Sequence, residues 1–309
     1  MAFIFPGQGS QYVGMGQELR RTPQGEEAFA TGRETLSDDF LRIILEGPAE
    51  ELRLTANTQP AILLVSVAAW RMLAANGIKA DFVAGHSLGE YSAHVAAGSM
   101  TLAEALAAVR RRGELMQEAV PPGQGAMAAI LGLSPEGVVQ ACHQAEEVGP
   151  VGPANYNCPG QIVISGQAEA VAKAAETAKS LGAKRAMPLA VSGPFHSVMM
   201  RPAGEKLGPV LARVAWQDPV MPVIANVNAQ PVTTKEQISA SLIKQVSGAV
   251  LWEQSVRYMV EQGVDTFVEC GPGKVLSGLV KKIAAGVKIL NVEDLVSLEN
   301  SLAYLRESR

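Results

Sequence analysis

Residues 85–89 have the sequence Gly-His-Ser-Leu-Gly and carry the clearest chemical signal in the chain. A short apolar run, residues 82–84, precedes this G-x-S-x-G pattern, and helix-forming residues follow it up to Gly98. A strand, a tight glycine turn and a helix are the context in which such a serine becomes an exposed nucleophile. The pattern therefore predicts that Ser87 performs nucleophilic acyl chemistry.

A serine hydroxyl is a weak nucleophile unless a neighbouring base accepts its proton as the new bond forms. His196 follows Gly-Pro-Phe in a predicted loop after an apolar segment, which suits such a base. The other three histidines favour structural or solvated roles, because His86 adjoins the nucleophile, His94 lies within a predicted helix and His143 belongs to a separate predicted unit. We therefore expect His196 to be the partner of Ser87.

Arg112 occupies an unexpected place in an apolar pattern. A Thr-Leu-Ala-Glu capping box at residues 101–104 starts a predicted helix that ends near residue 120. Ala105 and Val109 define an inward face at i and i+4, and Arg112 lies at i+7 on that face. A guanidinium there must meet an anion or bear a large desolvation cost. Two interpretations remain open: a structural arginine that pairs or reaches solvent, or a receptor for a carboxylate.

The composition limits the classes of partner. The 309 residues are 48% hydrophobic, enough for one large domain or two unequal ones. A formal net charge of −4 argues against nucleic acid as the main partner. The longest apolar run, residues 61–70, is too short and too interrupted to cross a bilayer. We expect neither a nucleic-acid nor a membrane partner.

The three cysteines, Cys142, Cys158 and Cys270, are scattered and lack metal-ligand spacing, so we expect reduced thiols and no metal. Residues 2–5 enter a strand-like run without a basic or cleavable leader pattern. These features predict a cytoplasmic protein.

The first glycine-rich loop, residues 6–11, follows the first predicted strand. It lacks the Lys-Ser/Thr pair of a phosphate-binding loop, and Tyr12 stands where a dinucleotide fingerprint needs its third glycine. Open α/β sheets bind ligands at the carboxyl ends of their strands. The loop is therefore either part of a ligand site or an ordinary turn between strand and helix.

The predicted elements divide the chain into two units. A Pro-Pro-Gly-Gln-Gly linker at residues 121–125 precedes a β-α-β-β-α-β order that is typical of a ferredoxin-like unit. We predict the α/β class: an α/β-hydrolase-like large domain with a parallel sheet, residues 1–124 and 191–309, and an inserted ferredoxin-like small domain, residues 125–190.

Taken together, the motifs resemble the malonyl-CoA:acyl carrier protein transacylases, the discrete acyltransferases of dissociated fatty-acid synthesis. The resemblance covers essentially the full chain, and the joint order of the motifs makes it specific. The matching segments are residues 5–11 (FPGQGSQ), 58–61 (TQPA), 85–92 (GHSLGEYS), 112–113 with Met116, 155–157, 159–161, 193–196 and 269–274.

The resemblance implies a role for each matching residue. Ser87 would be the nucleophile and His196 its base, with the imidazole oriented by the backbone carbonyl of Gln245 and not by an aspartate. The backbone N–H groups of Gln8 and Leu88 would form the oxyanion hole. The site would thus work as a Ser-His dyad.

The resemblance also implies what the site accepts. Arg112 would bind the free malonyl carboxylate, and Gln59 and Asn155 match substrate-pocket positions. Phe195, the residue before the catalytic histidine, resembles the malonyl type, since a serine there accompanies methylmalonyl groups in the wider superfamily.

Transfer would be ping-pong, through a malonyl ester on Ser87, to the phosphopantetheine thiol of acyl carrier protein, for fatty-acid elongation. Malonyl-CoA is then a substrate, the phosphopantetheine belongs to the partner, and no cofactor is required. We expect a monomer. Candidate contacts for the acidic carrier are Lys184, Arg185, Lys281 and Lys282.

Three alternatives remain. A serine esterase or thioesterase on the same core would share Ser87 and His196 but would have no use for a buried Arg112. A polyketide-type acyltransferase would take a different acyl-CoA. A non-catalytic scaffold that binds carrier protein would not need both Ser87 and His196.

Overall fold

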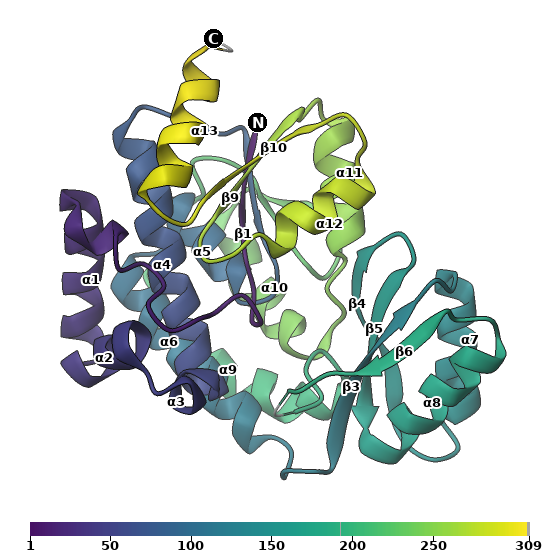
Figure 1. Cartoon of the computed structure of the whole chain (residues 1–309). Helices are drawn as coiled ribbons and strands as arrows, with labels where there is room; N and C mark the ends of the chain where they lie inside the picture. The colour runs from purple at the N-terminus through teal and green to yellow at the C-terminus, as the bar shows by residue number, and fades with distance from the viewer. Residues whose placement is uncertain (192, 308–309) are drawn as a thin grey trace.

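The computed structural model describes residues 1–191 and 193–307 and contains two separate β-sheets, each with its own helices (Figure 1). The larger sheet has six strands in the order β10-β9-β1-β2-β7-β8. All of its pairings are parallel except that of β7 with β8. Its strands are β1 (Ala2–Phe5), β2 (Phe82–Gly85), β7 (Val223–Ile224), β8 (Pro231–Val232), β9 (Thr266–Cys270) and β10 (Lys288–Val292).

The central strand β1 shows why this sheet is buried on both faces. Phe3 and Phe5 pack in the hydrophobic core on one face, whereas Ala2 and Ile4 pack in a second core on the other. Successive side chains of a strand point to opposite faces, so an all-apolar strand needs cover on both. Helices supply that cover, as expected for a parallel α/β sheet.

The helices around the larger sheet fall into two groups. The helices that contribute to the core containing Phe3 are α1 (Pro23–Thr35), α2 (Asp38–Glu46), α3 (Ala49–Arg53), α4 (Thr55–Ala75), α5 (Gly89–Ala96), α6 (Leu102–Glu118), α9 (Arg201–Leu211), α10 (Lys235–Ser247) and α13 (Leu295–Glu307), with the short 3-10 helices η1 (Leu19–Arg21) and η2 (Val198–Met200). The other face is covered by α11 (Trp252–Glu261) and α12 (Val275–Ile283).

The helix α4 begins earlier than its sequence suggests. Pro60 is typical of a first helical position, but the helix starts at Thr55 and encloses the proline. A proline inside a helix leaves the carbonyl four residues earlier without its usual donor. Here that carbonyl, on Ala56, accepts a hydrogen bond from Arg110 Nη1 at 2.8 Å. A side chain of the neighbouring helix α6 thus replaces the missing N–H.

Helix α4 is also long and apolar enough to span a membrane by length and composition alone. However, 78% of its most apolar 18-residue window is buried within the protein. It lies against α6 and α1 in the core of the large unit (Figure 1), as does the core helix of a soluble protein.

The smaller sheet is antiparallel, with the strand order β4-β5-β3-β6. The elements of this unit follow the order β-α-β-β-α-β along the chain, which confirms the ferredoxin-like prediction. The two helices of the unit pack with the sheet around a separate hydrophobic core (Figure 1). The elements are β3 (Gly125–Leu131), α7 (Pro135–Ala145), β4 (Val151–Cys158), β5 (Gln161–Gln167), α8 (Ala168–Ser180) and β6 (Arg185–Pro188).

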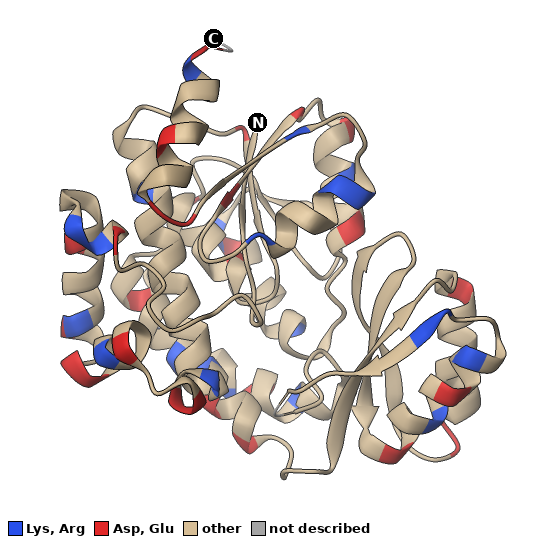
Figure 2. Cartoon of the chain, in the orientation of Figure 1, with Lys and Arg blue, Asp and Glu red and all other residues tan. Residues whose placement is uncertain are grey.

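Charged side chains are mixed in sign on the outer helices. Acidic and basic residues occur together on α1, α2 and α8, while the strands carry few charges (Figure 2). This distribution agrees with the small net charge of −4.

Candidate active site

Ser87 lies at the turn between β2 and α5 with a φ of 53°, a left-handed conformation that is unusual for a residue with a side chain. Both flanking glycines are required by close packing. A Cβ on Gly85 would lie 1.9 Å from the carbonyl carbon of Gly89, and one on Gly89 would lie 2.2 Å from Phe5 O. Because β1 and β2 pair in register, this turn lies beside the first loop. The predicted strand-turn-helix context of Ser87 is therefore present.

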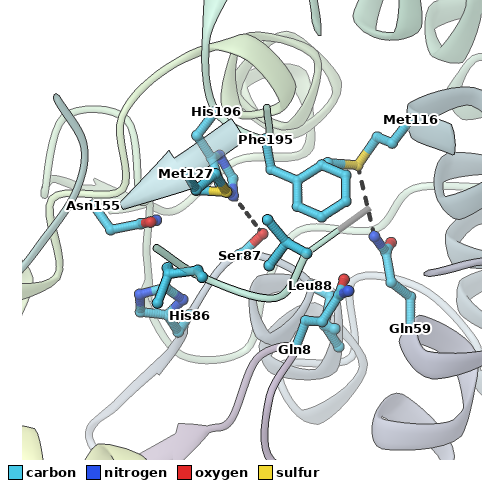
Figure 3. Close-up of a pocket in the computed structure, with 12 residues that line it drawn as sticks. Gln8, Gln59, His86, Ser87, Leu88, Met116, Met127, Asn155, Phe195 and His196 are labelled. Carbon is cyan, nitrogen blue, oxygen red and sulfur yellow. Dashed lines mark hydrogen bonds between the residues drawn. The ribbon is translucent and has the colours of Figure 1, made fainter. Parts of the chain in front are cut away.

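His196 is placed to accept the proton of Ser87. The Oγ of Ser87 lies 2.7 Å from His196 Nε2 (Figure 3). On the other side of the ring, Nδ1 lies 2.9 Å from Gln245 O and 3.1 Å from Gly248 O. A carbonyl only accepts, so Nδ1 must carry the hydrogen and Nε2 is left as the acceptor. The orienting group is thus main-chain carbonyl oxygen, supplied by the end of α10 and the residue that follows it.

The surroundings of His196 favour its neutral form. Burial, and then the positive charge of Arg112, lower the pKa of His196 to about 3. The imidazole is therefore uncharged near neutral pH and has a free lone pair on Nε2.

Arg112 lies on α6, is only 1% exposed, and contacts the nucleophile. Its Nη2 donates to Ser87 Oγ at 3.0 Å and to Gln245 Oε1 at 2.9 Å, and its Nη1 donates to Gln59 Oε1 at 2.7 Å. The guanidinium carbon lies 5.7 Å from the centre of the Tyr91 ring. Burial lowers the pKa of Arg112 from its usual value. All of its hydrogen bonds named here go to uncharged oxygen atoms.

Within the part of the chain that the structure describes, Arg112 Nε has no hydrogen-bond partner. Tyr91, through a side-chain interaction, and the nearby Glu90 both favour the charged form of the guanidinium, whose Nε lies beside the Nη2 that contacts Ser87. Two adjacent N–H groups are the geometry with which arginine grips a carboxylate. The contact of Nη2 with Ser87 Oγ places the guanidinium near any acyl group carried by Ser87, although Arg112 itself does not line the cavity beside Ser87.

A cavity of about 120 Å³ lies next to Ser87 (Figure 3). It lies between the two units: Met127 and Asn155 belong to strands of the small sheet. Four residues predicted for the site, Gln8, Gln59, Asn155 and Phe195, line it together with the nucleophile and base. The full lining is Gln8, Gln59, His86, Ser87, Leu88, Met116, Met127, Asn155, Leu189, Val191, Phe195 and His196.

Gln8 and Leu88, the two residues predicted to supply the oxyanion hole, both line this cavity. Gln8 belongs to the loop after β1, and Leu88 is the N-cap of α5. Among residues 1–191 and 193–307, neither amide has a hydrogen-bond acceptor. Two free N–H groups at one cavity can bind a developing oxyanion.

The lysines and arginine predicted as carrier contacts lie outside the cavity lining. Lys184 and Arg185 are exposed at the start of the edge strand β6, and Lys281 and Lys282 are exposed on α12. The structure does not gather these four side chains with the catalytic pair.

The remaining histidines have different surroundings. His86 lines the cavity, and its Nε2 lies 2.9 Å from Asn157 Oδ1. His94 is fully buried, and burial lowers its pKa to about 3. His143 is exposed beside Glu146.

Two residues at the site were not predicted from the sequence. Glu90 is fully buried on α5, and its Oε2 accepts from Gln245 Nε2 at 2.8 Å. Asn226, directly after the strand-like run ending at Ala225, accepts from Ser87 N at 2.7 Å. A signal existed in each case. Glu90 is an acid three residues after the nucleophile, and Asn226 follows a strand at the edge of the sheet where ligands bind.

Comparisons with known proteins give one consistent family. The family model described as "Acyl transferase domain" matches residues 2–298. The chain is 51% identical over 309 residues to the malonyl CoA-acyl carrier protein transacylase of Bacillus subtilis, covering 99% of this chain and 98% of that protein. It is 48% identical over 284 residues to the Escherichia coli K12 protein of the same name, covering 91% of this chain and 92% of that one.

Solved structures of similar fold include the malonyl CoA-acyl carrier protein transacylase of Clostridium perfringens, with a TM-score of 0.96, 42% identity and coverage of 99% of this chain and 97% of that chain. Another is a malonyl-transacylase solved in complex with its type II PKS acyl-carrier protein, with a TM-score of 0.95, 44% identity and coverage of 98% and 99%. The large α/β unit with a parallel sheet and the ferredoxin-like unit are thus shared with known structures.

Proposed function

Since this chain belongs to the acyl transferase family, alongside the malonyl CoA-acyl carrier protein transacylases, we propose that it transfers a malonyl group from malonyl-CoA to the phosphopantetheine thiol of an acyl carrier protein. Both substrates follow from the names of its relatives. The geometry of this site supports the roles that we propose below for individual residues.

The observation that carries the proposal is the contact between Arg112 Nη2 and Ser87 Oγ at 3.0 Å. A malonyl ester on Ser87 would place its free carboxylate three bonds from Oγ, within reach of the guanidinium. A buried arginine attracts an anion strongly, because desolvation removes the water that would otherwise stabilise its charge. A hydrolase for neutral esters gains nothing from such a residue.

In the first half-reaction, Ser87 Oγ attacks the thioester carbonyl of malonyl-CoA while His196 Nε2 accepts the hydroxyl proton. The tetrahedral oxyanion is stabilised by the amides of Gln8 and Leu88, and one such donor is typically worth about 3 kcal/mol of barrier. The C–S bond breaks, and the proton on His196 passes to the leaving CoA thiolate. Malonyl-Ser87 and free CoA result.

In the second half-reaction, the phosphopantetheine thiol of the carrier gives its proton to His196 and attacks the ester carbonyl. The Ser87 oxygen leaves and recovers the proton from His196. The carbonyl oxygens of Gln245 and Gly248 accept from Nδ1–H in both the neutral and the protonated ring and so orient it, and no aspartate is required. The enzyme is a Ser-His dyad with a ping-pong cycle.

Phe195 sets the size of the acyl group in this proposal. It lines the cavity next to the base and is only 6% exposed. A rigid aromatic ring leaves no space for a 2-methyl branch on the acyl chain. Gln59 and Asn155 complete the pocket for the malonyl group.

The cellular setting is also a proposal. We infer that the protein acts in the cytoplasm as a monomer, needs no cofactor, and supplies malonyl-carrier protein for fatty-acid elongation. The exposed residues Lys184, Arg185, Lys281 and Lys282 are candidate contacts for an acidic carrier, where they would mainly raise the association rate.

A transfer assay tests this function. Purified protein is mixed with malonyl-CoA and a phosphopantetheine-bearing carrier protein. The mass of the intact carrier protein is measured by mass spectrometry, and free malonate is measured separately. We expect malonyl-carrier protein with little free malonate. Release of malonate and CoA without malonyl-carrier would identify a thioesterase and reject the proposal.

A further inference from the structure

The backbone of Ser87 is held by side chains on both of its polar groups. Its N–H donates to Asn226 Oδ1 at 2.7 Å, and its carbonyl accepts from Gln245 Nε2 at 2.9 Å. Asn226 Nδ2 also donates to Gly85 O at 2.7 Å, so it spans the turn. A left-handed serine persists only where its surroundings impose that conformation. Asn226 and Gln245 are the side chains that impose it here.

These two residues meet at one atom. Glu90 Oε2 accepts from Gln245 Nε2 at 2.8 Å and from the backbone N–H of Asn226 at 2.9 Å. Glu90, Asn226 and Gln245 are all fully buried. Gln245 also holds His196 through its own carbonyl oxygen. A single carboxylate oxygen therefore links the supports of both the nucleophile and the base.

We propose that Glu90 is a positioning residue, whose Oε2 fixes Asn226 and the Gln245 amide and thereby holds Ser87 and His196 in their reactive arrangement. This inference deepens the proposed function, because it concerns the same site. Glu90 touches neither reacting atom in the contacts above and acts through its two neighbours.

The orientation of the Gln245 amide explains why an acceptor is needed at this position. Its Nε2 faces Ser87 O and Glu90 Oε2, which uses both amide hydrogens, and its Oε1 faces Arg112 Nη2. A donor in place of Glu90 Oε2 would oppose this orientation and turn the amide. Arg112 would then lose an acceptor and Ser87 a support. The contact between Glu90 Oε2 and Gln245 Nε2 thus affects the nucleophile and the guanidinium together.

The function of Glu90 rests on the position of its acceptor more than on its charge. Burial raises the pKa of Glu90 to about 7, so both protonation states occur near neutral pH. In the described part of the chain, Glu90 Oε1 has no hydrogen-bond partner and is free to carry the proton. Oε2 can therefore accept both hydrogen bonds in either state.

Two substitutions separate position from charge. Glu90→Gln keeps an acceptor oxygen at full side-chain length but removes the charge. Glu90→Asp keeps the charge but withdraws the oxygen by one methylene. The exposed Glu299→Asp on α13 is the matched control for the same chemical change far from the site.

The readout is the rate at which phenylmethylsulfonyl fluoride modifies Ser87, followed by mass spectrometry. In that reaction Ser87 Oγ bonds to sulfur, fluoride leaves, and His196 takes the hydroxyl proton. This sulfonylation requires the positioned Ser-His dyad but neither a malonyl group nor a carrier protein. An altered sulfonylation rate can therefore be told apart from a failure of malonyl transfer. The same variants are compared in the rate of Ser87 malonylation, with melting temperature measured in parallel.

We expect Glu90→Asp to slow both reactions by about 10²-fold, the effect of an ångström-scale misplacement at a reacting centre. Glu90→Gln should remain within about tenfold of the parent, because a neutral acceptor makes a weaker bond in the same place. Parent-like rates for a folded Glu90→Asp would overturn the proposal. So would a folded Glu90→Gln that is slower than Glu90→Asp, since charge would then be the decisive property.

Discussion

Replacement of Arg112 by alanine separates acyl donors that carry a carboxylate from those that do not. In the parent, the guanidinium contacts Ser87 Oγ, Gln59 Oε1 and Gln245 Oε1 at 2.7–3.0 Å. With malonyl-CoA the donors of Arg112 would turn to the substrate carboxylate. With acetyl-CoA there is no carboxylate to hold, and the arginine contributes no such binding.

The magnitude follows from the hydrogen bonds lost. A hydrogen bond to a charged group contributes about 1.5–3 kcal/mol, so two parallel bonds to the malonyl carboxylate amount to roughly 3–6 kcal/mol. The kcat/KM for malonyl-CoA should therefore fall by roughly 10²- to 10⁴-fold. For acetyl-CoA we expect an unchanged or higher rate. The positive charge of Arg112 is one of the causes that lower the pKa of His196, and its removal makes the imidazole more basic.

The assay measures acylation of the protein by malonyl-CoA and by acetyl-CoA in parallel. Arg111→Ala is the matched control, because Arg111 is the preceding residue on α6 but pairs with Glu114 and Glu118 at the surface. Melting temperatures of both variants show how much of any loss comes from unfolding. An equal loss of malonyl and acetyl uptake in folded Arg112→Ala would refute the role of Arg112 as carboxylate receptor.

Three further predictions concern packing, acid stability and selectivity. Gly89→Ala should lower the free energy of unfolding in urea by more than about 3 kcal/mol, because the added Cβ would lie 2.2 Å from Phe5 O. The control Gly278→Ala, which has open space around it on α12, should not lower the free energy of unfolding. Equal effects of the two substitutions would refute the packing argument. Burial lowers the pKa of folded His94 to about 3, whereas the same residue in the unfolded chain has its usual pKa of about 6.5. Below about pH 6.5 the unfolded state therefore binds a proton that the folded state does not, so the free energy of unfolding falls as the pH falls. Between about pH 7.5 and pH 5, the parent should therefore lose about 2 kcal/mol relative to His94→Leu, and a constant difference would contradict this. Phe195→Ser should raise the ratio of methylmalonyl to malonyl acylation at least about tenfold by making room for the branch, and an unchanged ratio would remove Phe195 as the size filter.

Local signals predicted much of the fold. The capping box at Thr101 and Glu104 is formed as expected, with the Glu104 side chain accepting from Thr101 N and the Thr101 side chain accepting from Glu104 N. The order of elements between residues 125 and 190 identified the ferredoxin-like topology, because short antiparallel strands and helices alternate there without long excursions. Such features depend on neighbours in the sequence.

Features that depend on distant segments were harder to predict. The start of α4 at Thr55 cannot be predicted from Pro60, because the carbonyl of Ala56 that loses its donor there is satisfied by Arg110, far along the chain. The network of Glu90, Asn226 and Gln245 joins three separate segments, and no spacing in the sequence encodes their convergence on one oxygen. The role of Gln245 was predicted only through the resemblance to a family.

Local pattern did identify Ser87 and Arg112, for a clear physical reason. The first needs glycines at fixed offsets, and the second interrupts an apolar helical face that otherwise continues into the core. Their contact at 3.0 Å is the part that only the structure supplies.

The most direct test of the account is the covalent intermediate. The protein is exposed briefly to malonyl-CoA without carrier protein, digested, and examined by mass spectrometry, with Ser87→Ala treated in the same way. The account predicts one malonyl group on Ser87 of the parent and none on the variant. A malonyl group on a different residue, or rapid hydrolysis of malonyl-CoA with no adduct, would contradict it.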